Sequence, residues 1–242
     1  MDFQDLVKFR RSSRWVFSTK KQIPDDELKK ILEAARYAPT PHNRQPFEII
    51  VVKDRNVIKQ ISEIRFKLGM EEIKQHAFWT KSVEELESIG IGVQPEVLPK
   101  FVLDLKDHPE LINDDDFWDR TMSMYALLMQ ASSVLMFILY DPTIPGIGPL
   151  KNVWGMLSVG AVMQNIWLAA NNLGISVHVA SGQTMTIDAK RKIFDILEIP
   201  KKYKLMILFR LGYETKFGRY GTPYRRKIEN FVHLDKFSNK FK

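Results

Sequence analysis

The stretch VLMFILYDP, residues 134–142, is the strongest structural signal in the chain. It is continuously apolar until Asp141 and Pro142 stop it, which predicts a strand buried on both faces over 134–140. A loop rich in proline and glycine follows. A long apolar helix is then predicted over 156–173, closed by Gly174, and a short strand over 175–179.

Working outward, the chain continues to mix helices and strands. Residues 24–37 have apolar positions at helical spacing, with Pro24 and three acids in the first turn, so they predict a helix. The run from Ile49 to Val52 predicts a buried strand, 189–197 a helix and 205–211 a further strand. Residues 55–130 have weaker periodicity and are interpreted as an inserted, lid-like segment. The class is α+β or α/β with four or five core strands.

The composition favours one globular domain over the whole of residues 1–242. With no cysteine, the chain has no disulfide, thiolate metal site or cysteine nucleophile. The acids near the N-terminus do not suit a signal peptide, and the asparagines of the long apolar helix do not suit a membrane span, so we expect a cytoplasmic protein. The net charge of +7 favours anionic partners without choosing among them.

The common catalytic motifs are missing from the sequence: it has no dinucleotide-binding or Walker loop, no nucleophile elbow and no zinc-binding H-E-x-x-H. The five histidines lack metal-ligand spacing, so no metal is expected. What remains are anion and amide donors. RRSSR, residues 10–14, offers guanidinium groups and hydroxyls suited to phosphate, and PTPHNRQP, residues 39–46, offers two amides on a backbone stiffened by proline.

The order of these stretches is more informative than any one of them. RRSSR comes first, followed by a helix beginning IPDDEL, the pattern A-P-T-x-x-N-x-Q-P-F with a strand, a long helix containing QNIWLAANNLG, and an arginine-bearing tail. This order resembles the nitroreductase-like FMN-dependent oxidoreductase family over roughly 7–54 and 131–232. Residues 55–130 are covered poorly.

The resemblance implies an α+β, three-layer fold with a central, mainly antiparallel sheet flanked by helices. It also implies a domain-swapped homodimer with FMN at the interface and the long apolar helix in the core or interface. The implied activity is an NAD(P)H oxidoreductase that reduces nitroaromatic, quinone or related electron-poor small molecules by ping-pong hydride transfer through the flavin. The chemistry is centred on the flavin, so no catalytic side chain is implied.

Site residues follow from the resemblance position by position. Residues 10–12 are expected at the FMN phosphate and ribityl chain, and Arg14 near the flavin pyrimidine, where a cation favours the anionic reduced flavin. The 39–45 loop is expected to reach the flavin from the partner chain, residues 180–182 to face its reactive edge, and one of two late arginines to complete a phosphate clamp. The expected cofactor-binding residues are Arg10, Arg11, Ser12, Arg14, Pro39, Thr40, Pro41, Asn43, Gln45, Ala180, Ser181, Gly182, Arg225 and Arg226.

Three positions depart from the family pattern. Thr40 and Pro41 stand where two small hydroxyl residues are usual, and Ser181 stands where several relatives have glutamate. Other activities remain open: a lid-bearing relative that dehalogenates substrates reductively or fragments flavin to a cobamide base, and a flavin-binding protein without turnover. A basic nucleic-acid-binding protein is disfavoured because it leaves PTPHNRQP and the long apolar helix unexplained, so neither nucleic acid nor membrane is an expected partner.

Overall fold

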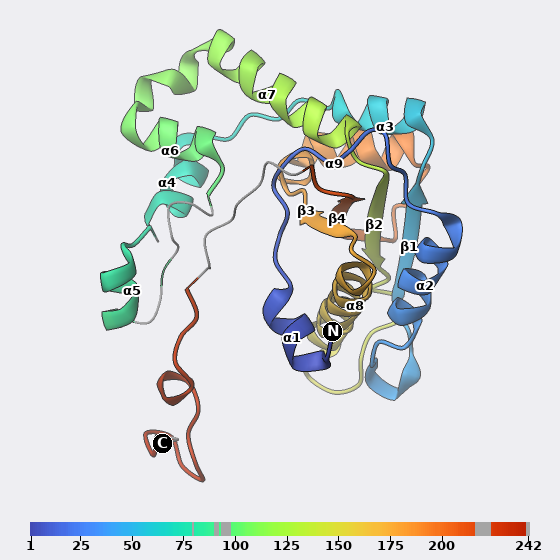
Figure 1. Ribbon diagram of the computed structural model, residues 1–242, viewed down its shortest axis with the longest axis vertical. Helices are drawn as coiled ribbons and strands as arrows, with labels where there is room; N and C mark the ends of the chain where they lie inside the picture. The colour runs from blue at the N-terminus through green and yellow to red at the C-terminus, as the bar shows by residue number, and fades with distance from the viewer. Residues whose placement is uncertain (79, 90–91, 93–97, 216–223, 241–242) are drawn as a thin grey trace. The chain divides into compact units, whose positions relative to one another are not determined.

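A computed structural model describes residues 1–78, 80–89, 92, 98–215 and 224–240. The chain forms two compact units: residues 1–66 with 122–218, and residues 67–121 with 219–242. Figure 1 follows the elements along the chain. They are α1 Phe3–Phe9, α2 Asp25–Arg36, η1 Pro41–Asn43, β1 Phe47–Val52, α3 Arg55–Ser62, α4 Met70–Phe78, α5 Val83–Ile89, α6 Lys100–Asp107, η3 Pro109–Asn113, α7 Asp115–Gln130, β2 Val134–Tyr140, α8 Lys151–Asn172, β3 Ser176–Val179, η4 Gly182–Thr184, α9 Ile187–Ile196, β4 Lys204–Gly212 and η5 Ile228–Asn230.

The first unit is built on a four-stranded sheet in the order β1-β2-β4-β3, and every neighbouring pair is antiparallel. Strand β2 spans the residues predicted from the apolar run and is buried at all seven positions. It lies inside the sheet, between β1 and β4, which explains why its sequence is apolar without alternation. The predicted α+β fold with a mainly antiparallel sheet is confirmed.

Side chains of β2 alternate between two cores, as the period of a strand requires. Val134, Met136 and Ile138 belong to a core that includes residues of α2 and α8. Leu135 and Phe137 belong to the opposite core, which includes residues of α3 and α9. The sheet therefore has helices on both faces and forms the middle of three layers (Figure 1).

The predicted elements of this unit agree with the structure apart from their ends and one burial. Helix α8 begins five residues before the predicted start at Met156, and β4 is one residue longer at each end than predicted. Strand β1 was expected to be buried, but only Val52 is fully buried, because β1 is an edge strand of the sheet. An edge strand has one unpaired side and less cover than a central strand.

Helix α8 is long and apolar enough to cross a membrane by length and composition, and it is the one such helix in the described part of the chain. Its buried positions include Val159, Val162 and Ile166, which pack in the same core as β2. The buried face of α8 is therefore apolar because it packs in the core of the protein.

The second unit contains α4, α5 and α6 and the first turns of α7. Ser82 and Glu85 form a capping box: each side chain accepts a hydrogen bond from the other residue's main-chain N–H. Phe117 and Trp118 are buried, and the indole Nε1 of Trp118 donates to the Ile112 carbonyl at 2.9 Å. The insertion predicted over 55–130 stays a prediction, although the second unit includes 67–121 of it.

Candidate functional site

The segment carrying RRSSR is fastened to the edge strand of the sheet. The main-chain N–H of Ser13 donates to the Val177 carbonyl at 2.8 Å, so the segment lies against β3. Ser13 is also buried, and its hydroxyl donates to the Glu214 carboxylate. This contact turns Ser13 inward, whereas Ser12 and Arg14 are half-exposed.

The beginning of the same segment is held by α8. The indole Nε1 of Trp167 donates to the Arg11 carbonyl at 3.1 Å, and the Arg10 guanidinium lies 4.6 Å from the centre of the Trp167 ring. Arg11 itself is exposed and lies 5.3 Å from the Phe9 ring centre. Cation–π contacts of this kind orient a guanidinium without neutralising it. Arg10 therefore remains positively charged at the start of the RRSSR segment.

Residues 180–182 leave the end of β3, close to this segment. The Ala180 N–H donates to the Leu208 carbonyl at 2.8 Å, and Ser181 is exposed. Gly182 is buried against Phe66, and a Cβ built there comes within 2.4 Å of the Phe66 ring. Position 182 therefore has no room for a side chain, because the Phe66 ring packs directly on the Gly182 backbone.

Phe66 is in turn packed against Tyr125 of α7, with ring centres 5.6 Å apart in an edge-to-face arrangement. Burial raises the pKa of Tyr125 to about 12, and the charges of Arg14 and Arg210 oppose that rise. The phenol is therefore protonated at neutral pH and can donate a hydrogen bond. Tyr125 is not among the predicted site residues, because it lies in 55–130, where the periodicity of the sequence is weak.

Arg210 of β4 is the second residue that sequence reasoning missed. It is 1% exposed, and its guanidinium donates to the Ser132 hydroxyl at 3.0 Å and the Trp15 carbonyl at 3.3 Å. It also lies 3.1 Å from Nδ1 of His178 on β3. An arginine inside the apolar run LMILFRLG was the available signal, because an arginine is almost never fully buried unless it has partners.

The loop with the predicted amides is built on its own hydrogen bonds. The Gln45 N–H donates to the Thr40 hydroxyl at 3.1 Å, and the Gln45 amide donates to the Asn43 side-chain oxygen at 3.0 Å. His42, Asn43 and Gln45 all have positive φ, near 50°. Asparagine tolerates this left-handed conformation better than most residues. The loop thereby exposes the amides of Asn43 and Gln45.

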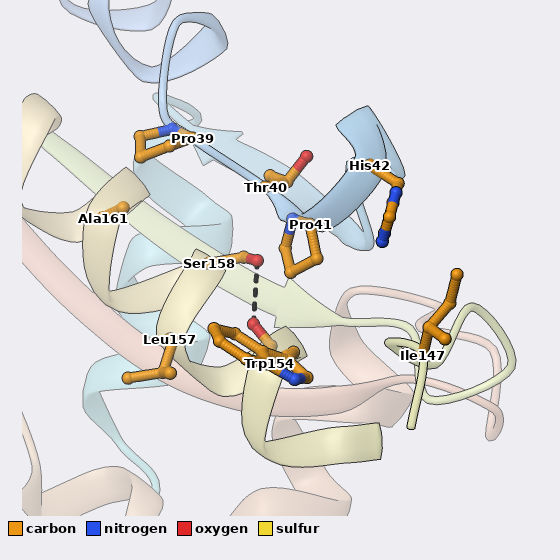
Figure 2. A pocket seen from close by; sticks show the side chains of 9 residues that line it. All are labelled: Pro39, Thr40, Pro41, His42, Ile147, Trp154, Leu157, Ser158 and Ala161. Carbon is orange, nitrogen blue, oxygen red and sulfur yellow. Dashed lines mark hydrogen bonds between the residues drawn. The ribbon is translucent and has the colours of Figure 1, made fainter. Parts of the chain in front are cut away.

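A pocket of about 600 Å³ opens between this loop and the N-terminal half of α8. Figure 2 shows its mostly apolar wall, with Trp154 of α8 across from Pro41 of the loop. Within α8, the Ser158 hydroxyl donates to the Trp154 carbonyl at 2.9 Å, so that hydroxyl is engaged by its own helix. The residues that line the pocket are Pro39, Thr40, Pro41, His42, Ile147, Trp154, Leu157, Ser158 and Ala161.

The predicted site residues of the first unit fall into two groups at different ends of α8. Residues 10 and 11 lie near Trp167, in the C-terminal half of α8, and residues 39–42 line the pocket beside Ser158, in its N-terminal half. Nine residues separate these two helix positions, a rise of about 13 Å. Residues 180–182 follow β3, to which Ser13 is hydrogen-bonded. Within one chain the structure therefore joins the first two predicted segments and leaves the loop apart.

Arg225 and Arg226 belong to the second unit. The Arg225 guanidinium donates to the Tyr224 carbonyl at 2.9 Å, and that of Arg226 donates to the Asn230 carbonyl at 2.6 Å. Both residues are exposed. Their predicted role in a phosphate clamp with Arg10 stays a prediction.

Comparison with known proteins places this architecture. A nitroreductase of Bacteroides fragilis solved with bound FMN matches with a TM-score of 0.59 and 19% identity, over 98% of this chain and 100% of that one. A nitroreductase family protein of Clostridium novyi matches with a TM-score of 0.58 and 17% identity, over 100% of this chain and 97% of that one. At such identities the likeness establishes the fold.

Sequence comparison reaches further in one part of the chain. A curated protein of Archaeoglobus fulgidus, provisionally named NADH dehydrogenase/NAD(P)H nitroreductase, is 47% identical over 58 residues. That match spans 24% of this chain and about a third (32%) of the relative's length. The model of the nitroreductase family matches residues 7–213, which include the fastened segment, the loop and the whole sheet. The chain therefore belongs to the nitroreductase family.

Proposed function

We propose that this protein is an FMN-dependent NAD(P)H oxidoreductase that reduces electron-poor acceptors such as nitroaromatics and quinones. The observation that carries the proposal is the joining of residues 10–14 to β3 beside residues 180–182, within a chain of the nitroreductase family. FMN, when bound, supplies the redox chemistry by taking electrons from NAD(P)H and passing them to the acceptor.

The donor set fits a flavin mononucleotide. Arg10 supplies a guanidinium and Ser12, two residues on, a hydroxyl, and this pair of group types matches the oxygens of a phosphate monoester. Arg14 lies in the electrostatic environment of Tyr125 and His178, so it adds positive charge where residues 180–182 begin. The protein's part in the reaction is to bind and orient the cofactor and to supply fixed charge.

We further propose that the active protein is a homodimer in which the 39–45 loop of one copy completes the site of the other. The separation of the loop from residues 10–14 along α8 supports this arrangement. So do the exposed apolar side chains on α1, which contacts α8, and on the N-terminal half of α8, because exposed apolar residues that gather in patches mark association sites. These exposed side chains are Phe3, Val7, Phe9, Val153, Trp154, Met156 and Leu157.

The experiment is titration of the purified protein with FMN, followed by rapid-mixing reduction of the bound flavin with NADH or NADPH. We expect saturable FMN binding and bleaching of the flavin absorbance by at least one nicotinamide. Recovery of the absorbance with a nitroaromatic or a quinone then identifies the acceptor class. A protein that binds no FMN contradicts the proposal, and flavin that neither nicotinamide reduces identifies a binding protein without turnover.

A further inference from the structure

Arg210 is a buried cation in the apolar centre of the sheet. It is 1% exposed on β4, with Phe209 and Leu211, themselves buried, on either side in sequence. Its guanidinium carbon lies 4.8 Å from the centre of the Phe17 ring. Burying a charged side chain costs free energy unless hydrogen bonds compensate for the lost water, so its donors are expected to have specific partners.

Three of these partners come from three different parts of the chain. Nε donates to the Ser132 hydroxyl, one terminal nitrogen approaches Nδ1 of His178, and the other donates to the Trp15 carbonyl. Trp15 directly follows RRSSR, and His178 lies two residues before Ala180. One planar guanidinium thus links the chain that carries the predicted phosphate ligands to the strand that leads into residues 180–182.

We propose that Arg210 is a positioning residue for flavin binding: it holds the RRSSR segment against β3 through the Trp15 carbonyl and His178. The proposal rests on the proposed FMN-dependent function. Arg210 acts through these two partners rather than by touching the cofactor itself. Lysine cannot replace it, since a single ammonium cannot present donors in the fixed, planar fork that reaches three acceptors.

His178 is suited to be a permanent acceptor in this link. A guanidinium has donors only, so Nδ1 must be the unprotonated nitrogen and the ring hydrogen sits on Nε2. Burial, followed by the charges of Arg210 and Arg14, lowers the pKa of His178 to about 3. The imidazole therefore stays neutral over the physiological range, and the acceptor at Nδ1 is retained.

The RRSSR segment is also held to the fold by hydrogen bonds on both sides of Trp15, in addition to the contact with Arg210. Two of these hydrogen bonds precede Trp15 in sequence: the Ser13 N–H donates to the Val177 carbonyl, and the Trp167 indole donates to the Arg11 carbonyl. Phe17 pairs with Glu214 downstream. Arg210 is thus one contact between these two fastenings, alongside the Thr215 hydroxyl, which donates to the Val16 carbonyl at 3.1 Å. Loss of Arg210 should loosen residues 14–16 without detaching the segment.

The test compares Arg210→Lys and Arg210→Met with the wild-type protein in two measurements. The first is amide hydrogen exchange of residues 11–17 in the full-length protein without FMN. The second is the dissociation constant for FMN, from quenching of flavin fluorescence. We expect about tenfold faster exchange in this segment and about tenfold weaker FMN binding, the scale set by one lost hydrogen bond to a charged group.

Arg55→Lys is the matched control. Arg55 donates to the Ser132 and Gln130 carbonyls at the α7–β2 turn, so it is also an arginine that binds main-chain oxygens. Both of these acceptors lie outside residues 10–15, so replacement of Arg55 should leave the exchange of that segment and the FMN dissociation constant within about twofold. A change equal to that of Arg210→Lys would show a general loss of stability and overturn the proposal.

His178 supplies a second pair of variants if Arg210→Met does not fold. His178→Gln keeps an oxygen acceptor and should retain FMN binding, whereas His178→Leu removes the acceptor and should weaken it. Unchanged exchange of residues 11–17 in folded Arg210→Lys overturns the proposal, and so does faster exchange with an unchanged FMN dissociation constant. If the wild-type protein binds no FMN, the proposed function fails, and the exchange measurement still reports whether Arg210 holds the segment.

Discussion

The two groups of predicted flavin ligands are held in opposite ways. The RRSSR segment has little structure of its own and is fastened from outside, by β3, by Trp167 and by Arg210. The 39–45 loop is shaped mainly from within, by hydrogen bonds among Thr40, Asn43 and Gln45. The first depends on the tertiary fold, and the second depends largely on its own sequence.

This difference matches what each group has to do in the proposed dimer. A segment that supplies charge to a cofactor within its own chain gains from rigid attachment to the sheet. A loop that reaches into another copy has to keep its shape on an exposed surface. Substitutions near one end of α8 should therefore have different effects from those near the other end. The largest losses of stability are expected where the substituted residue packs in the core.

The largest effect is expected at the loop end of α8, for Gly155→Ala. A Cβ at Gly155 comes within 2.2 Å of the Tyr140 ring, which is fully buried. Overpacking of this kind should cost up to about 3 kcal/mol in the free energy of unfolding. Gly160→Ala on the same helix is the control, because a Cβ there meets nothing within 4 Å, and it should be neutral or stabilising by about 1 kcal/mol. Urea unfolding measures both.

The next largest effect is the dependence of the free energy of unfolding on pH, which arises from His178 next to the RRSSR segment. Folding lowers the His178 pKa from 6.5 to about 3, chiefly through burial. Between these values the unfolded chain binds a proton that the folded chain does not, so stability is lost as the pH falls below 6.5. The loss should reach about 2 kcal/mol near pH 5, at up to about 1.4 kcal/mol per pH unit. His178→Gln should flatten this dependence in urea unfolding between pH 5 and 7; parallel curves for both proteins would contradict it.

A smaller effect separates the two serines of RRSSR. Ser13→Ala removes a buried hydroxyl bonded to Glu214 and should cost about 1 kcal/mol of stability, with FMN binding changed less than about twofold. Ser12→Ala should do the reverse, because the half-exposed Ser12 is predicted to contact the phosphate. Thermal unfolding and FMN titration of both variants measure the pattern. Equal FMN affinities in both would return the stretch to an ordinary basic turn.

The smallest effect is expected within the loop. Thr40→Val keeps the shape of the side chain and removes the hydroxyl that accepts from the Gln45 N–H. The loss of one exposed hydrogen bond should cost about 0.5 to 1 kcal/mol. Amide exchange at Gln45 should rise while that of residues 11–17 stays at the wild-type rate. A change at both places would show that the two ends of α8 are coupled.

Much of the fold could be predicted from local patterns. The apolar run of β2 and the amphipathic pattern of α2 were sufficient because each pattern reflects the element's own surroundings. The start of α8 was placed too late, since residues 151–155 include Lys151 and Asn152 and look like loop. Their helical state comes in part from packing: Asn152 accepts a hydrogen bond from the hydroxyl of Tyr140, a residue of β2.

The candidate site was predictable where a motif carried it and not where packing carried it. RRSSR and PTPHNRQP stand out in the sequence because their residue types match an anion and a heteroaromatic ring. Arg210, His178 and Tyr125 carry no motif. They come together because β3, β4 and α7 meet beside Trp15, and no local pattern encodes a contact between residues 195 positions apart.

The sequence by itself therefore determined the class of the fold, the family and the chemical types of the predicted ligands. Periodicity and short motifs are local properties, and local properties can be read along a chain. Only the tertiary structure decided that Ser13 turns inward, that Gly182 makes room for Phe66, and that the loop lies apart from RRSSR along α8. Those outcomes depend on which distant side chains share a buried space, and that is settled when the layers pack.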